Sequence, residues 1–302
     1  MTEKNCKDLE KALDSKDTNF IIKTIGSFKS KYRIRIGKKF KEITGKDLLS
    51  EIKRFFDGDL YEFIKALFTD PIEYDAESIH LAIKDQESLL EIILTRPNSV
   101  IKQIMQKYFD IYKANLEETI NNSVIGDFKK LISTLLKCGR NEEDTLSSEE
   151  IEEKANELVE AEYDDWNLNE NSPFCLFLTK YTRNEMVAIA KIYNKKANKN
   201  IEQKVQDVFS GDIKKFLQIT LYCVISPSEY LATRINDALS GISVNIRLLI
   251  RILTTRSDLD LYKIIKYYQL LYKKDLKDTL SILIKDDMGK LMIEIINNNQ
   301  VK

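Results

Sequence analysis

The chain has 302 residues and a formal net charge of −1, with 43% hydrophobic and 31% charged residues, a composition that excludes a disordered chain. Nine glycines and four prolines are too few turn residues for a large β-protein, so we expect helices joined by short polar loops. No apolar run reaches the roughly 18 residues needed to cross a bilayer. The N-terminus also lacks the apolar segment of a secretory signal.

The cysteines indicate a reducing compartment. They are far apart and show no metal-ligand spacing: Cys6, Cys138, Cys175 and Cys223. We therefore interpret them as reduced thiols of a cytoplasmic protein.

Charge is distributed unevenly along the chain. Residues 18–41 contain eight basic residues and no acid, whereas residues 141–165 contain twelve acids and one base. Both blocks can be solvated helix faces. Alternatively, the basic block is a patch for an anionic partner, such as acidic lipid, nucleic acid or an acidic protein tail.

A repeated apolar pattern organises the chain into four copies. We anchor the copies on four aliphatic residues that recur at similar intervals: Leu48, Leu116, Ile201 and Leu276. Twelve positions before each anchor stands an isoleucine, and eight before stands an aromatic residue: Ile36 and Phe40, Ile104 and Tyr108, Ile189 and Tyr193, Ile264 and Tyr268. Apolar residues also recur at positions −27, −26 and −23 relative to the anchor and at +15 and +16. These spacings place the residues on one face of a helix.

In chain order, the predicted repeats are 1–70, 71–140, 148–225 and 226–302. Residues 141–147 form a polar linker that divides the array into two pairs of repeats. Each repeat is expected to contain five helices. The first is exemplified by residues 72–83 and 227–239. The others are expected at positions −28 to −21, −18 to −4, −2 to +8 and +11 to +22 relative to the anchor.

An aspartate stands at the predicted start of each fifth helix. It occupies position +11 relative to the anchor, as Asp59, Asp127, Asp212 and Asp287. An aspartate there can accept hydrogen bonds from the free N–H groups of the first turn. In three repeats a glycine precedes it and suits a tight turn: Gly58, Gly126 and Gly211.

The chain resembles the annexin family in its organisation: it has four copies of similar length, five predicted helices in each copy, and a longer central link. Residues 89–120 and 248–280 are similar to the second helix, third helix and start of the fourth in an annexin repeat. Arg96 and Arg256 both stand at position −20 relative to the anchor, where annexin repeats place an arginine. Residues 208–221 resemble the family's entry to the fifth helix, and the start of the chain, with residues 11–25, resembles the α-giardin branch of protist annexins. The resemblance implies an all-α array of four repeats forming a curved disc.

Annexin function, as the resemblance implies, depends on calcium held by a first-loop G-x-G-T pattern and by a carboxylate before the fifth helix. Both features are missing here. The first loops read LDSKDT (13–18), LAIKDQ (81–86), WNLNEN (166–171) and GISVNI (241–246). The carboxylate position holds Phe55, Ser123, Val208 and Leu283. We therefore expect no calcium site of the family type, because calcium needs six to eight oxygen ligands.

Weaker calcium sites remain open. Asp14 and Asp17 are expected to face Asp57 and Asp59 in the first repeat, and the fourth repeat has adjacent Asp286 and Asp287. The alternative interpretation is that these six residues are solvated loop acids and helix caps.

Two other segments are candidate contact sites. In an annexin-like repeat the third helix lies away from the calcium loops, and its basic residues Arg33, Arg35, Lys38 and Lys39 are candidates for binding an acidic cytoskeletal partner. Trp166 falls in the first loop of the third repeat, where some annexins carry an exposed tryptophan, so it is a candidate membrane anchor. Partial burial of this ring is the alternative.

Catalysis is not expected. The single histidine, His80, lies on a predicted helix with no nucleophile motif nearby, and the motifs of hydrolases, P-loop proteins and zinc proteases are missing. A nucleic-acid partner is also not expected, since overall basicity is low. Two hypotheses follow. One is an annexin-like peripheral phospholipid-binding protein with weak or noncanonical calcium dependence, linked to the cytoskeleton. The other is a calcium-independent structural or adaptor protein of microtubules or flagella.

Overall fold

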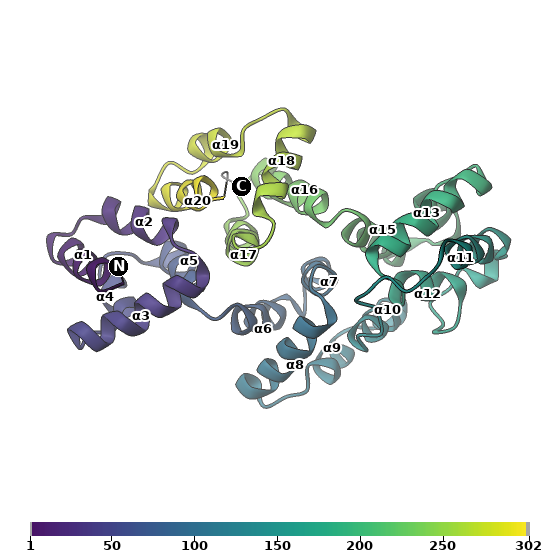
Figure 1. The fold of residues 1–302 in the computed structure, drawn as a ribbon, viewed down its shortest axis with the longest axis horizontal. Helices are drawn as coiled ribbons and strands as arrows, with labels where there is room; N and C mark the ends of the chain where they lie inside the picture. The colour runs from purple at the N-terminus through teal and green to yellow at the C-terminus, as the bar shows by residue number, and fades with distance from the viewer. Residues whose placement is uncertain (1, 300–302) are drawn as a thin grey trace. The chain divides into compact units, whose positions relative to one another are not determined.

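The computed structural model describes residues 2–299, and within that range the chain is helical throughout. It forms twenty α-helices and one short 3₁₀ helix, joined by short loops, with no strand between residues 2 and 299 (Figure 1). This confirms the all-α fold class.

Each predicted repeat contains five α-helices. The first has α1 (Thr2–Ser15), α2 (Thr18–Ser27), α3 (Ser30–Thr44), α4 (Leu48–Ile52) and α5 (Gly58–Phe68). The second has α6 (Pro71–Ala82), α7 (Gln86–Leu94), α8 (Asn98–Tyr112), α9 (Leu116–Ser123) and α10 (Gly126–Leu136).

The later repeats follow the same order. The third has α11 (Ser148–Glu160), the 3₁₀ helix η1 (Tyr163–Asp165), α12 (Pro173–Thr179), α13 (Arg183–Ala197), α14 (Ile201–Val208) and α15 (Gly211–Ile225). The fourth has α16 (Pro227–Ser240), α17 (Ile246–Arg256), α18 (Leu261–Tyr272), α19 (Leu276–Leu283) and α20 (Asp287–Asn297).

The repeated apolar positions form the core. The four isoleucines at position −12 have no exposed surface, and the four aromatic residues and the four anchors are buried as well. The apolar pair at positions +15 and +16 is also buried in every repeat. The periodicity therefore identified the inward face of each helix correctly.

The chain divides into two compact units, and they are not the sequential pairs that the linker predicts. The terminal unit consists of the residues up to Tyr74 together with those from Ser228 onward, and the middle unit runs from Asp75 to Pro227. The first repeat thus shares a unit with the fourth, and the second shares one with the third. The reason is a set of helix contacts that join the first repeat to the fourth, far apart in the sequence, and the second repeat to the third.

In the terminal unit, α2 packs closely against α20, and Figure 1 shows them side by side at opposite ends of the colour scale. Gly26 permits this approach, because a Cβ at this position would lie 2.5 Å from the Cβ of Glu294. Helix α17 packs against α5 in the same unit. In the middle unit, α11 packs on α13 and α7 packs on α15.

Glu185, in the first turn of α13, holds the central linker. Its Oε1 accepts hydrogen bonds from the backbone N–H groups of Thr145 at 2.7 Å and Leu146 at 2.9 Å, and its Oε2 accepts from Thr182 N–H at 2.8 Å. Burial raises the pKa of the Glu185 carboxyl, but these three backbone donors outweigh burial and lower the pKa overall.

The Glu185 contacts generate a stability prediction. Glu185→Gln replaces one acceptor oxygen with an amide nitrogen, so at least one of the three backbone N–H groups loses its partner, and we expect a loss of about 1–3 kcal/mol in the free energy of unfolding at pH 7. Because the folded-state pKa is lowered, the contribution is present at neutral pH and is lost as pH falls below about 5. Urea unfolding from pH 7 to pH 4 measures both effects. An equal loss at both ends of that range would contradict the assignment.

Candidate functional site

Polar residues of the first loops are used to begin helices. Asp17 accepts a hydrogen bond from Phe20 N–H at 3.0 Å and caps α2, and Asp85 accepts from Ser88 N–H at 3.2 Å and caps α7. In the fourth repeat Asn245 caps α17 through Leu248 N–H at 3.1 Å. These side-chain oxygens accept hydrogen bonds from backbone N–H groups that have no partner within the helix. This agrees with the interpretation of the loop acids as helix caps.

In the later loops, which precede α5, α10, α15 and α20, the N-cap residues are not the aspartates that the sequence predicts. Three of these helices begin with glycine at positive φ: 51° at Gly58, 64° at Gly126 and 62° at Gly211. The N-cap positions of the four helices are Asp57, Ile125, Ser210 and Asp286.

Of these four residues, only Asp286 accepts a cap hydrogen bond, from Met288 and Gly289 N–H. The predicted caps lie one or two residues later, inside the first turn: Asp59, Asp127, Asp212 and Asp287. At that position an acid still faces the positive end of the helix dipole, but its side chain is past the point from which it can cap.

Four candidate calcium residues gather at one cavity. Asp57 and Asp59 at the start of α5, and Asp286 and Asp287 at the start of α20, line a space of about 600 Å³ within the terminal unit. Asp14 and Asp17 do not line this cavity, so their expected pairing with Asp57 and Asp59 stays a prediction. The contact of α5 with α20 joins the first repeat to the fourth at this point.

The donor set does not fit a high-coordination calcium site. Between residues 2 and 299, no three His, Cys, Asp or Glu side chains come close enough to hold one ion. Asp286 already accepts two backbone hydrogen bonds, and Asp287 pairs with Lys290 at 2.7 Å. Any ion in the cavity would depend on backbone carbonyls and water, which is a low-affinity arrangement.

Exposed apolar side chains occupy the same loops, and the sequence interpretation missed them. Ile125, before α10, is 86% exposed, and Leu81, in the last turn of α6 beside the first loop of the second repeat, is 83% exposed. In the fourth repeat Ile242 is fully exposed in the first loop, and Ile282 is exposed at the end of α19. A detectable signal existed, because GISVNI and SVIGD place large aliphatic residues in segments that connect helices.

Trp166 does not provide the expected exposed ring. It is only 2% exposed, stacks on Phe174 with ring centroids 4.8 Å apart and lies edge-on to Tyr193 at 5.8 Å. The loop folds inward because these rings offer a large apolar surface. The exposed aromatic residue of this loop is Tyr163, whose hydroxyl donates to the carbonyl of Val208 at 2.9 Å and links the first and later loops of the third repeat.

The basic residues of α3 separate into two groups. Arg35 and Lys38 are exposed, and Lys39 pairs with Glu42 at 2.9 Å. Arg33 is 1% exposed, so its assignment as a partner-binding residue is wrong. The repeat register explains why: the equivalent positions are the buried residues Ile101, Met186 and Leu261.

Arg33 instead caps the end of α2. Its Nε donates to the carbonyl of Ile25 at 3.0 Å and Nη2 donates to the carbonyl of Gly26 at 3.5 Å. A cation here complements the negative end of the helix dipole. Burial lowers the pKa of Arg33 to about 10, and the charge of Asp258 partly offsets this, so the group remains charged at neutral pH.

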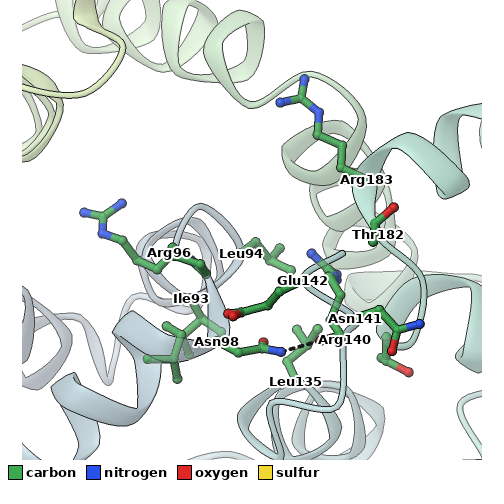
Figure 2. Close-up of a pocket in the computed structure, with 13 residues that line it drawn as sticks. Ile93, Leu94, Arg96, Asn98, Leu135, Arg140, Asn141, Glu142, Thr182 and Arg183 are labelled. Carbon is green, nitrogen blue, oxygen red and sulfur yellow. Dashed lines mark hydrogen bonds between the residues drawn. The ribbon is translucent and has the colours of Figure 1, made fainter. Parts of the chain in front are cut away.

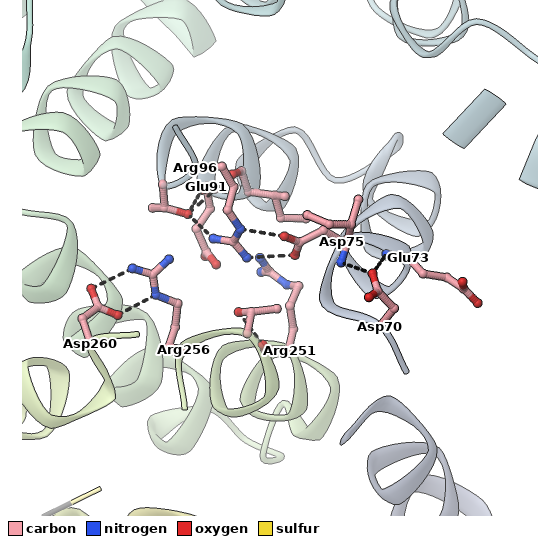
Figure 3. A network of polar contacts seen from close by, with 12 residues as sticks. Asp70, Glu73, Asp75, Glu91, Arg96, Arg251, Arg256 and Asp260 are labelled. Carbon is pink, nitrogen blue, oxygen red and sulfur yellow. Dashed lines mark hydrogen bonds and ion pairs between the residues drawn. The ribbon is translucent and has the colours of Figure 1, made fainter. Parts of the chain in front are cut away.

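The two arginines of the family resemblance are structural. Arg96 makes a two-pronged pair with Asp75 of α6, at 2.7 and 2.8 Å, and both side chains are buried (Figure 3). Arg256 pairs with Asp260 through two contacts of 2.7 Å and thereby joins the end of α17 to the start of α18. Asp260 also accepts a hydrogen bond from Ser228 of α16 at 3.1 Å. Each arginine thus ties the helices of its own repeat together.

His80 and the cysteines occupy packing positions. The imidazole of His80 stacks on Tyr112 with centroids 4.0 Å apart, and its Nδ1 lies 2.9 Å from the Tyr108 hydroxyl. The four cysteines are thiols and not disulfides, and burial raises the pKa of Cys6, Cys138 and Cys175. A thiol with a raised pKa is a poor nucleophile. None of the helices described between residues 2 and 299 has the length and hydropathy of a membrane span.

Comparison with known proteins identifies annexins among the relatives of this chain. The family model described as Annexin matches residues 74–135 and 230–295, within the second and fourth repeats. The chain is 30% identical to annexin A11 of Oryctolagus cuniculus over 287 residues, covering 94% of this chain but 57% of the relative. It is 29% identical to annexin A13 of Mus musculus over 301 residues, covering 98% of this chain and 95% of the relative. The chain therefore spans little more than half of annexin A11 and nearly all of annexin A13.

Solved structures show the same fold. A structure of annexin III matches with a TM-score of 0.89 at 24% identity, covering 98% of this chain and 93% of that one. A calcium-bound alpha-14 giardin matches with a TM-score of 0.80 at 20% identity, covering 98% and 99%. At these identities the likeness concerns the fold, so the narrower giardin assignment stays a prediction.

The two positions Arg33 and Arg35 form a matched pair for a stability prediction. Arg33→Ala removes a buried side chain and two hydrogen bonds, and we expect it to lower the free energy of unfolding by about 2–5 kcal/mol. Arg35→Ala removes an exposed side chain and should change it by no more than about 0.5 kcal/mol. Urea unfolding of both variants measures the difference, and similar values for the two would show that Arg33 is not a core residue.

Proposed function

The chain belongs to the annexin family, and from that premise we propose that it is a peripheral phospholipid-binding protein whose membrane contact depends mainly on apolar loop residues. Annexins as a family bind phospholipid in a calcium-dependent manner. In this chain the loops that would bridge calcium to lipid lack both the glycine-rich pattern and the carboxylate. Calcium dependence is therefore expected to be weak or noncanonical.

The observation that carries this proposal is the exposure of aliphatic side chains in the loops and in the helix ends that adjoin them. Leu81 and Ile125 belong to the second repeat, and Ile242 and Ile282 belong to the fourth. Moving one such side chain from water into the apolar boundary of a bilayer contributes about 1.5–3 kcal/mol. Two or more of these side chains, inserted together, can provide the membrane affinity that other annexins obtain from calcium bridging.

Calcium is expected to contribute less to membrane binding than the apolar residues. Asp57, Asp59, Asp286 and Asp287 remain the candidate residues for a weak ion, because they share a cavity in the terminal unit. Asp14 and Asp17 are weaker candidates, since Asp17 already caps α2. An ion held by carbonyls and a few carboxylates would be removed readily by a chelator.

A second candidate function is supported by α3. Its outward side carries Lys31, Arg35, Lys38 and Lys41, all exposed. Such a basic face suits an acidic protein segment, so the chain can act as a cytoskeletal adaptor with microtubules as the expected partner. Arg33 has no place in this surface, and Lys39 contributes less because of its pair with Glu42.

Vesicle sedimentation tests the first proposal. With phosphatidylserine vesicles, we expect pelleting in chelator that rises only modestly when calcium is added. Ile125→Ser and Ile242→Ser should each weaken binding by about three- to tenfold, the equivalent of losing part of one buried side chain. Both residues are exposed, so the fold should be unaffected.

Leu270→Ser on α18 is the matched control, because Leu270 is an exposed aliphatic residue outside the loops. It should bind vesicles like the parent chain. Strict calcium dependence together with full binding by Ile125→Ser and Ile242→Ser would overturn the proposal.

Sedimentation with microtubules tests the adaptor function. Binding through α3 should weaken as salt rises, because the charges are exposed. Arg35→Gln with Lys38→Gln should reduce binding several-fold at low salt, whereas Lys129→Gln, an exposed lysine of α10, should not. Unchanged binding by the double variant would exclude α3 as the contact.

A further inference from the structure

A cavity of about 340 Å³ lies within the middle unit, where the central linker passes the starts of α8 and α13 (Figure 2). Its walls include Ile93 and Leu94 of α7, Asn98 of α8, Arg140 just before the linker, and Glu142 of the linker. Its volume falls in the range of roughly 300–1,000 Å³ that small-molecule sites occupy. We call this space the linker cavity.

Arg140 is the unusual residue of the linker cavity. Its Nη2 donates to the carbonyl of Leu178 at 2.7 Å, at the end of α12, but its Nε is buried without any hydrogen-bond partner. Within residues 2–299, no carboxylate pairs with it, in contrast to the buried Arg96, which is neutralised by Asp75. Burial lowers the pKa of Arg140 to about 10, so the guanidinium is still charged at neutral pH.

The other charged groups around the cavity already have partners. Arg96 binds Asp75, and Arg183 donates to the carbonyl of Ile225 from both Nε and Nη2. In Figure 2 both of these guanidinium groups point away from the residues that surround Arg140. An anion entering the cavity would therefore meet the unneutralised charge of Arg140, and a small shift of this side chain would bring its unsatisfied Nε into contact with the anion.

Glu142 places a carboxylate at the start of α8. The Oε1 atom of this exposed side chain accepts a hydrogen bond from Ser99 N–H at 3.0 Å, in the first turn of α8. Helix α8 has 15 residues, and its N-cap, Pro97, provides no side-chain acceptor. The chain thus places its own anionic oxygen at the positive end of this helix, in the same cavity as Arg140.

We propose that the linker cavity binds a phosphate group, with Arg140 as its principal ligand and Glu142 as an internal competitor for the same position. A phosphate presents several acceptor oxygens, which match the forked donors of a guanidinium and the free N–H groups of a helix start. The site is separate from the apolar loops and from α3, so it goes beyond the proposed membrane and adaptor functions.

Titration of the full chain with inorganic phosphate tests the site, with binding followed by calorimetry or by ³¹P line broadening at pH 7. The parent chain should bind. Arg140→Gln should weaken binding at least tenfold, and Arg140→Lys should weaken it less, because charge is kept while the fork is lost. Glu142→Gln should strengthen binding several-fold, because it removes the competing charge. Arg54→Gln, which changes an exposed arginine of the terminal unit, is the control and should bind normally.

Two outcomes overturn the proposal: no phosphate binding by either the parent chain or Glu142→Gln, or equal binding by the parent chain and Arg140→Gln. If Arg140→Gln unfolds, as judged by its melting curve, the opposite effects expected from Arg140→Lys and Glu142→Gln still decide the question.

A second arm distinguishes the source of the phosphate. Vesicles containing phosphatidic acid are compared with free glycerol phosphate, each against the parent chain and Glu142→Gln. Stronger binding of only the soluble ester by Glu142→Gln would assign the cavity to a free metabolite, and stronger binding of the vesicles would assign it to a lipid headgroup. Phosphatidylserine binding through Ile125 and Ile242 should be the same in both chains, so failure of the membrane proposal and failure of this one give different results.

Discussion

Burial of the same few positions in every repeat is the constraint on which the rest of the structure depends. One isoleucine and one aromatic ring of the third helix are buried together in each copy, as Ile104 and Tyr108 are in the second. Apolar surface removed from water is the main favourable term in folding, and here it is divided into four similar clusters. Loop chemistry is then free to vary at the exposed loop positions, which lie outside these clusters.

That freedom explains how a family fold can persist while the metal-binding pattern of its loops is lost. Asp17, Asp85 and Asn245 are short polar residues whose oxygens satisfy the starts of helices, which any helical array requires. A calcium site requires a carboxylate at a second loop as well, and Phe55 and Leu283 stand at that position instead. The helices need only the polar caps at their starts, so they form with or without an ion.

Helix positions were predictable from the sequence and side-chain exposure at single sites was not. The interval from −18 to −4 relative to Leu48 predicted a helix over 30–44, which is the observed α3. Arg33, however, was assigned to the surface from its charge alone, although its register matches the buried Met186. Trp166 was misassigned because burial of a loop ring depends on Phe174 and Tyr193, which belong to later helices of the repeat. The pairing of the first repeat with the fourth could not be predicted either, since contacts such as that of α2 with α20 have no local signature.

The discontinuous terminal unit has a consequence for biosynthesis. During translation α2 emerges well before α20, the helix against which it packs. The middle unit is continuous in the chain and can fold while synthesis proceeds. The face of α2 that packs on α20 stays uncovered until α20 has been synthesised, which makes the nascent chain vulnerable to aggregation during that interval.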